Sequence, residues 1–263
     1  MNRKIGEVEA LFRYPVKSMS GEPLEAAALS WHGLDGDRRL AFRRVGDRSG
    51  FPWLTAGKLP ELILHAPRRA EGSDGAGPPS HVRTPDGQDL DVFGPELAKR
   101  IGDRHGSPVE MTYLDRGIFD EASVSLITSA SVAEAGRLAA RRIDVRRFRP
   151  NILIASDRSI PFEEDQWIHG VLTFGEDADG AAIAVTNHDE RCAMVNFDPD
   201  SGETDKEVLK AIVRARKNRL GVYGTVTRPG RLGVGQSVYF EPRREEGRLR
   251  LDDGDPRRVE TAP

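Results

Sequence analysis

The stretch "RRFRPNILIAS", residues 146–156, sets a cluster of arginines directly before a short apolar run. Two further runs of similar length, "AAIAVTN" at 181–187 and "SVYFEP" at 237–242, are also apolar and end in polar residues. Short apolar runs rich in branched residues and bounded by turns predict strands. Residues 6–16 and 24–45 show the same strand-like pattern, interrupted by glycine-containing turns. The chain is therefore predicted to be mainly β.

Two segments have the periodicity of helices. Residues 129–142 place small or apolar side chains on one face, with Ser131 three residues before Glu134, the spacing of a capping box. A second helix is predicted to begin at Thr204, with Glu207 as its capping partner and basic residues at its end. A few helices among many short strands predict an α+β fold that is dominated by strands.

Three polar segments are expected to lie outside the packed elements. Residues 66–82 are dense in Gly, Pro and Ser, which predicts a flexible surface loop. Residues 243–263 mix charges without an apolar face, a pattern typical of a disordered tail. The acidic "PFEEDQW", residues 161–167, is expected to form a solvated turn, and a place at the mouth of a pocket is the alternative.

The composition excludes several classes of function. The 263 residues carry 39 basic and 42 acidic side chains, so the net charge of -3 favours neither nucleic acid nor an anionic membrane as partner. The N-terminal sequence has no apolar stretch of signal-peptide length, and nothing approaches the apolar span of about 18 residues that crosses a membrane. A single cysteine cannot form an internal disulfide or a four-cysteine metal site. We therefore expect a protein of the cytoplasm.

Two clusters near the N-terminus combine positive charge with turn chemistry. In "YPVKSMSG", an X-Pro unit holds the chain extended before Lys17 and Ser18, whose ammonium and hydroxyl suit an anionic ligand. In "GLDGDRRL", Asp37 can hold one of Arg38 and Arg39 while the other projects. An ordinary solvated turn and a simple ion pair at a strand end are the respective alternatives.

The arginine cluster at residues 146–149 is a third candidate. Arg147 and Arg149 alternate around Phe148, so the period of a strand would place both guanidiniums on one face. Two like charges side by side repel each other unless an anion joins them, and arginine binds phosphate through two hydrogen bonds. The pattern leaves an anion site and two independent surface charges equally open.

Cys192, the only cysteine, directly follows Arg191 in "NHDERCAMVNFDPDSGE", residues 187–203. A neighbouring guanidinium favours the thiolate, which is both a nucleophile and a soft metal ligand. A small buried hydrophobe is the alternative for a lone cysteine. His188 lies four residues away, and this spacing does not by itself build a catalytic dyad.

In this order, "YPVKSMSG", "GLDGDRRLAF", "FRPN" and "RC…DPDSGE" resemble the MOSC-domain proteins, which include the C-terminal domain of molybdenum cofactor sulfurase and the amidoxime-reducing components. The resemblance spans most of the chain. It implies an N-terminal β-barrel module at 1–118, a MOSC β-barrel domain at 119–242 and the tail at 243–263. It also implies a bound molybdenum cofactor, with molybdopterin as the pterin.

The resemblance assigns the polar clusters to this cofactor. Cys192 is implied to ligate the metal and to be the catalytic residue. The cofactor-binding residues are implied to be Lys17, Ser18, Arg38, Arg147, Arg149, Asn151 and Cys192. One departure concerns "WLTAGKLPEL", where Gly57 stands in place of the family's arginine. Either Lys58 substitutes for this arginine or one phosphate contact is missing.

The activity that the resemblance implies is the reduction of N-hydroxylated compounds by a molybdenum-cofactor oxidoreductase. With one cysteine and no glycine-rich nucleotide-binding turn, the electrons are expected from a separate flavin or iron–sulfur protein. The alternative is a carrier that holds the cofactor or a persulfide sulfur on Cys192. A metal-free thiol enzyme is a third possibility, and it would need a histidine near Cys192.

Overall fold

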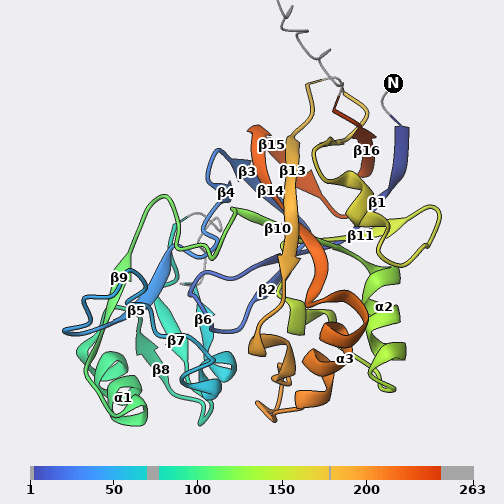
Figure 1. The fold of residues 1–263 in the computed structure, drawn as a ribbon. Helices are drawn as coiled ribbons and strands as arrows, with labels where there is room; N and C mark the ends of the chain where they lie inside the picture. Colours follow the sequence, from blue (N-terminus) through green and yellow to red (C-terminus); the bar gives the residue numbers. More distant parts are fainter. Residues whose placement is uncertain (1–2, 70–76, 178, 244–263) are drawn as a thin grey trace, which may run out of the picture.

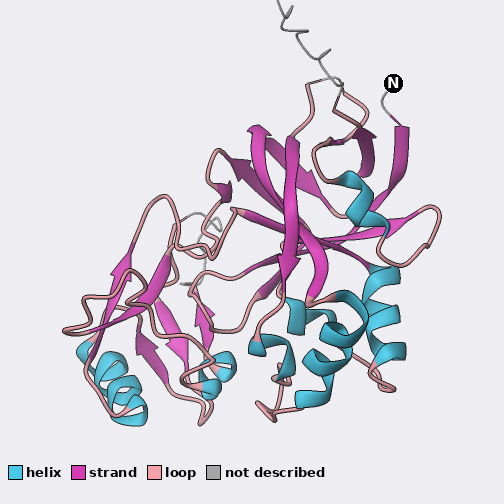
Figure 2. Cartoon of the chain, viewed as in Figure 1, coloured by secondary structure: helices cyan, strands magenta, loops and turns pink. Residues whose placement is uncertain are grey.

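A closed barrel of seven strands forms one side of the molecule, and the short elements β5 to β9 with α1 lie on the other (Figures 1 and 2). The computed structural model describes residues 3–69, 77–177 and 179–243. Pairing of β1 with β11 closes the ring, and the β10–β11 pair alone among the ladders of this sheet is parallel. In order around the barrel, the strands are β11 (Ile152–Ser156), β10 (Val124–Thr128), β14 (Arg219–Arg228), β13 (Ala182–Glu190), β12 (Val171–Phe174), β16 (Ser237–Glu241) and β1 (Arg3–Arg13).

The apolar runs of the sequence form the barrel core, which confirms the prediction of a mainly β fold. All five residues of β10 are buried, and β11 exposes only Ala155. Side chains such as Leu126, Ile154 and Phe174 pack with Trp167 inside the barrel. Strand β1 comes from the first predicted domain, yet it pairs with β11 and β16. The barrel thus takes strands from both ends of the chain, and the predicted boundary at 118 and 119 stays a prediction.

Helices cover one end of the barrel (Figure 2). A parallel pair needs a crossover connection, and α2 (Ser129–Leu138) provides it between β10 and β11. Helix α3 (Lys206–Arg216) packs beside α2 through a shared apolar cluster. Both helices were predicted, but the residues that cap them are not the predicted ones. Thr128 accepts a hydrogen bond from the Ser131 N–H at the start of α2, and Asp205 caps α3.

A second apolar cluster lies in the part of the molecule built from residues 14–113. Its members include Met19, Phe42, Leu62 and Leu97, and they lie on several short elements. The elements of this region are β2 (Glu22–Leu24), β3 (Ala26–Ser30), β4 (Gly33–Leu34), β5 (Leu40–Arg44), η1 (Pro60–Leu64), β6 (Ala66–Arg68), β7 (His81–Arg83), β8 (Asp89–Asp91), α1 (Pro95–His105) and β9 (Val109–Tyr113), while β15 (Gly230–Gly233) returns from the C-terminal half to pair with β3.

The prediction of a loop at 66–82 is wrong at both ends. Strand β6 pairs with β7, and Val82 is fully buried in the second apolar cluster. In β7 (His81–Arg83), the buried Val82 stands between two exposed polar residues. The high Gly and Pro content of residues 66–82 masked this short strand in the sequence. Residues 70–76 of this loop and residues 244–263 of the predicted tail lie outside the described residues.

The prediction of a solvated turn at 161–167 is also wrong. The 3₁₀ helix η3 (Glu163–Trp167) buries both glutamates, and Glu164 Oε2 accepts hydrogen bonds from Thr128 Oγ1 at 2.9 Å and Ser131 Oγ at 2.8 Å. Burial raises the pKa of Glu164. We call Glu163, Glu164, Thr128 and Ser131 the carboxylate cluster. In the described part of the chain, no helix has the length and apolar character needed to span a membrane.

Candidate functional site

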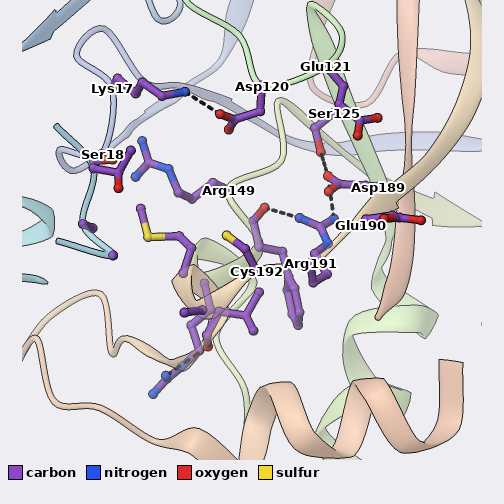
Figure 3. Close-up of a pocket in the computed structure, with 18 of the residues that line it drawn as sticks. Lys17, Ser18, Asp120, Glu121, Ser125, Arg149, Asp189, Glu190, Arg191 and Cys192 are labelled. Carbon is purple, nitrogen blue, oxygen red and sulfur yellow. Dashed lines mark hydrogen bonds and ion pairs between the residues drawn. The ribbon is translucent and has the colours of Figure 1, made fainter. Parts of the chain in front are cut away.

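A cavity of about 410 Å³ gathers six of the seven predicted site residues (Figure 3). Its wall combines segments that are distant in sequence. Lys17 and Ser18 follow β1, Arg38 precedes β5, and Cys192 follows β13. The other two are Arg147 and Arg149, which belong to η2 (Val145–Phe148) and its C-terminal cap.

Lys17 is fixed at the wall of this cavity and is only 6% exposed. Its backbone N–H donates to the Leu40 carbonyl at 2.7 Å, and its ammonium donates to Asp120 Oδ1 at 2.7 Å. Burial lowers the pKa of Lys17, and the Asp120 carboxylate partly opposes this effect. Ser18, the next residue, adopts a left-handed backbone with φ of 67°. Such a conformation is costly for a residue with a side chain and is concentrated at functional sites.

Asn151 does not line the cavity and acts behind Arg38. The amide is fully buried, and its Oδ1 accepts hydrogen bonds from Arg38 Nη1 at 3.3 Å and from the Ser125 N–H at 3.1 Å. Arg38 also forms an ion pair with Asp37, as expected, and donates from Nη2 to the Arg149 carbonyl at 3.0 Å. Burial is the largest single influence and lowers the pKa of Arg38, but Asp37, Tyr223 and Tyr14 together raise it above the usual value. The contacts of Asn151 hold Arg38 in place, and its expected contact with the cofactor stays a prediction.

Arg149 is the least compensated cation of the cavity. Its guanidinium lies 4.1 Å from the ring centroid of Tyr14, and Nη1 donates to the Met19 carbonyl at 2.6 Å. Nη2 is buried without a hydrogen-bond partner, and none of the described carboxylates lies within ion-pair distance. Burial lowers the pKa of Arg149 to about 10, so the side chain is charged at neutral pH. A half-buried guanidinium with an unpaired, buried Nη2 donor and no ion-pair partner favours a nearby anion.

The predicted strand-like alternation of Arg147 and Arg149 is wrong. Residues 145–148 form a 3₁₀ turn, and Arg149 caps it with φ of 51°. The two guanidiniums diverge as a result. Arg147 Nη2 donates to Asp198 Oδ2 at 2.9 Å and Nη1 donates to the Asn196 carbonyl at 3.0 Å, so its charge is already paired at the cavity edge.

Cys192 is exposed and faces the cavity, so the alternative of a small buried hydrophobe does not hold. Arg191 also lines the cavity, but its guanidinium is engaged elsewhere (Figure 3): Nη1 donates to the Phe148 carbonyl at 2.7 Å and Nη2 lies 3.0 Å from Asp189 Oδ2. These contacts of Arg191 are to Phe148 and Asp189, and none of them is to the thiol of Cys192, so a direct contact does not support the expected stabilisation of the thiolate by Arg191.

The structure lends no support to a cysteine–histidine dyad. His188 Nε2 lies 3.5 Å from Asp165 Oδ1, and this histidine is not among the residues that line the cavity. Among the described residues, no group of three or more His, Cys, Asp and Glu side chains is placed to hold a metal. A metal in this cavity would need most of its ligands from a cofactor, with Cys192 as the protein's thiolate.

Sequence reasoning missed the acidic lining of the cavity. Asp189 is buried, accepts a hydrogen bond from Ser125 Oγ at 2.8 Å and pairs with Arg191. Burial raises the pKa of Asp189, although Arg191 acts in the opposite direction. Its spacing of two from Arg191 on a strand predicts a shared face, which is a usable signal. Asp120 and Glu121 lie on an irregular segment between β9 and β10, where no periodicity marks them.

Gly57 also lines the cavity, whereas Lys58 is exposed and does not. A Cβ atom at Gly57 would meet only Thr55 Oγ1, at 3.6 Å, so the wall is open at this point. Of the two expectations for this position, a missing cationic contact agrees better with an exposed Lys58 outside the cavity lining than substitution by Lys58 does.

Comparison with known proteins gives concordant matches over most of the chain. Residues 102–239 match the MOSC domain family, and residues 5–116 match the MOSC N-terminal beta barrel domain. The chain is 25% identical to mitochondrial amidoxime reducing component 2 of Bos taurus, a match that covers 90% of this chain and 84% of the relative. It is 26% identical to molybdenum cofactor sulfurase of Drosophila grimshawi over 80% of this chain, but only 31% of that longer protein.

A solved structure shows the same fold. The YUAD protein from Bacillus subtilis superimposes with a TM-score of 0.51, at 14% identity, over 92% of this chain and 100% of its own. At this level of identity, the similarity supports the arrangement of strands and helices and says nothing about chemistry.

Proposed function

The chain belongs to the MOSC-domain family, and on that premise we propose that it is a molybdenum-cofactor oxidoreductase that reduces N-hydroxylated compounds. The family places the protein among relatives whose names refer to amidoxime reduction and to the molybdenum cofactor. A function related to this cofactor follows from membership. The reaction, the substrate class and the role of each residue are the proposal.

One observation carries the proposal: an exposed thiol and a half-buried guanidinium without an ion-pair partner share one cavity. The residues fit the implied cofactor on two counts. Cys192 offers a soft sulfur ligand. Arg149 offers a free Nη2 donor, and anionic phosphate accepts charge-assisted hydrogen bonds from guanidinium groups.

Each residue then has a defined task. Arg149 and Lys17 would hold the anionic tail of the cofactor, and Asn151 keeps Arg38 oriented for the same purpose. Cys192 would hold the metal. When bound, the molybdenum cofactor would supply the two-electron chemistry that removes oxygen from nitrogen. Phe51, 43% exposed at the cavity wall, and Met194 would give the entrance an apolar surface for an organic substrate.

The electrons for this reaction are proposed to come from a separate flavin or iron–sulfur protein. The single cysteine is assigned to molybdenum, which leaves no thiolate for an iron–sulfur relay within these 263 residues. Encounters between redox proteins are usually small, charged and sensitive to salt. We keep the cytoplasm as the proposed compartment.

A carrier of the cofactor, or of a persulfide sulfur on Cys192, is the second candidate, because an exposed thiol in an open cavity also suits transfer to another protein. The test uses full-length protein made in a host that synthesises molybdopterin. An enzyme reduces an aryl amidoxime over many turnovers with a reduced viologen dye as donor, and does not use NADH alone. A carrier contains the cofactor and shows no turnover with either donor. Turnover with NADH and no second protein would contradict the proposed partner.

A further inference from the structure

The ion pair between Lys17 and Asp120 is strongly asymmetric. The Lys17 side chain is 6% exposed, whereas that of Asp120 is 62% exposed, and their charged atoms are 2.7 Å apart. Lys17 is anchored by backbone hydrogen bonding to β5 and has a second acceptor in the Ile118 carbonyl at 3.4 Å. Asp120 can therefore turn into water at little cost, while Lys17 remains at the cavity wall.

The position of Asp120 matters because both partners line the cavity. Asp120 lies on the irregular segment 114–123, which joins β9 to β10 and is attached by the Ile118 N–H to the Arg38 carbonyl. Figure 3 shows the Lys17 ammonium directed at Asp120, away from Cys192. An anion entering the cavity would have to share this ammonium or displace the carboxylate, since two anions on one ammonium repel each other.

We propose that Asp120 is a built-in competitor for the anionic ligand: it neutralises Lys17 while the cavity is empty and is displaced from Lys17 by a phosphate or pyrophosphate group. The inference rests on the proposed function, because it takes this cavity to bind a phosphorylated cofactor. A buried ammonium without a counter-ion is unfavourable, so the exchange of one anion for another keeps Lys17 charged throughout. Release of Asp120 also removes one of the contacts that hold the segment 114–123, while the hydrogen bond from the Ile118 N–H to the Arg38 carbonyl remains. Occupancy of the cavity is thereby linked to the mobility of the residues around Asp120.

The test measures binding of inorganic pyrophosphate to the full-length, cofactor-free chain by isothermal titration calorimetry. Asp120→Asn removes the competing charge and is expected to bind pyrophosphate about fivefold more tightly, the size expected for a partly exposed ion pair. Glu110→Gln is the matched control, since Glu110 is 54% exposed and pairs with Arg43 on β5 by a 3.2 Å contact. The control removes the same charge and is expected to leave affinity unchanged.

Three outcomes decide the proposal. A gain for Asp120→Asn that disappears in the background of Lys17→Met supports competition at Lys17. Equal or weaker binding by Asp120→Asn, with normal binding by the wild type, overturns the competitor and leaves the anion site intact. Failure of the wild type and Asp120→Asn alike to bind pyrophosphate overturns the anion site together with the competitor.

Hydrogen exchange gives a second measurement that does not need Lys17→Met to fold. In the wild type, saturating pyrophosphate should speed amide exchange of peptides covering 114–123. Asp120→Asn should show the fast exchange without any ligand. Slower exchange on binding would mean that the segment is ordered by the anion, which contradicts displacement of Asp120.

Discussion

The cavity and the carboxylate cluster both bury charged side chains, but they differ in how those charges can be neutralised. Glu164 lies fully enclosed under α2, and burial raises the pKa of its carboxyl, so a proton can remove the charge without any ligand. Arg149 retains its charge until about pH 10, lacks a carboxylate partner among the described residues and faces an open cavity beside Cys192. The carboxylate cluster can therefore be neutral within the folded protein, whereas the charge of Arg149 is neutralised only by an anionic ligand that binds in the cavity.

The comparison shows that burial of charge is a poor guide to function when it is taken alone. Both regions use residues that composition would place on the surface. What distinguishes the cavity is an unpaired donor, an opening and a reactive side chain in one place. Substitutions in the cavity should therefore alter ligand binding and activity, and substitutions in the carboxylate cluster should alter stability.

The largest effect is expected for Cys192→Ala. Turnover of the aryl amidoxime should fall to background, because a methyl group cannot ligate a metal. The midpoint of thermal unfolding of the cofactor-free protein should stay within experimental error, since the thiol is exposed. Activity assays measure the turnover, and differential scanning calorimetry measures the midpoint of unfolding. Retained turnover would remove Cys192 from the metal site.

Glu164→Ala should give the next largest effect, on stability alone. It leaves the hydroxyls of Thr128 and Ser131 without their shared acceptor and opens a gap, which costs about 2–4 kcal/mol of unfolding free energy. Glu134→Ala, which breaks an exposed ion pair on α2, the helix that carries Ser131, should cost less than about 0.5 kcal/mol. Urea unfolding measures both. Equal losses would show that the carboxylate cluster is not buried as described.

Arg149→Ala should reduce binding of the anionic ligand without a comparable loss of stability. The loss of a charge-assisted contact costs about 1.5–3 kcal/mol, or roughly a tenfold to hundredfold weaker affinity for pyrophosphate. Stability should change little, because removing a partly desolvated cation offsets the loss of the hydrogen bond to the Met19 carbonyl and of the contact with the Tyr14 ring. Calorimetric titration and urea unfolding measure the two effects. Unchanged affinity would move the anion away from Arg149.

The smallest effect is a pH dependence that separates the two regions. Burial lowers the pKa of Lys17, so pyrophosphate affinity should decline as the pH rises through this lowered value and again near 10, where Arg149 titrates. Glu164 affects stability instead of binding: its folded pKa is raised, so its contribution to stability is complete at low pH and is lost as the pH rises through that value. Glu164→Gln should abolish the pH dependence of stability and leave the pH dependence of pyrophosphate affinity unchanged. Calorimetric titration and urea unfolding across the pH range check both.

The sequence predicted the parts of this structure that depend on local pattern. Apolar runs marked β10, β11 and β13, and the ordered motifs led to the MOSC-domain family, which the comparisons confirm. Lys17 and Cys192 were found because unusual residue types stand at strand ends, and the structure brings them to one cavity.

The remaining features depend on tertiary contacts that periodicity does not encode. The 3₁₀ turn before Arg149 broke the expected alternation with Arg147, and packing under α2 buried Glu164, which the sequence alone placed in solvent. Asn151 supports Arg38 from a position 113 residues away in the chain. Asp120 lies on a segment without regular structure, so nothing in its neighbourhood indicated a partner for Lys17.

The central claim is that this cavity holds a molybdenum cofactor through Cys192 and the cationic side chains. The most direct test is the molybdenum and molybdopterin content of wild type and Arg149→Ala, purified side by side from a host that synthesises the cofactor. Mass spectrometry of the metal and fluorescence of the oxidised pterin give the two amounts. We predict near-equimolar amounts of both in the wild type and a clear loss of both in Arg149→Ala. Wild-type protein that contains neither, or a variant that retains both in full, would contradict the account.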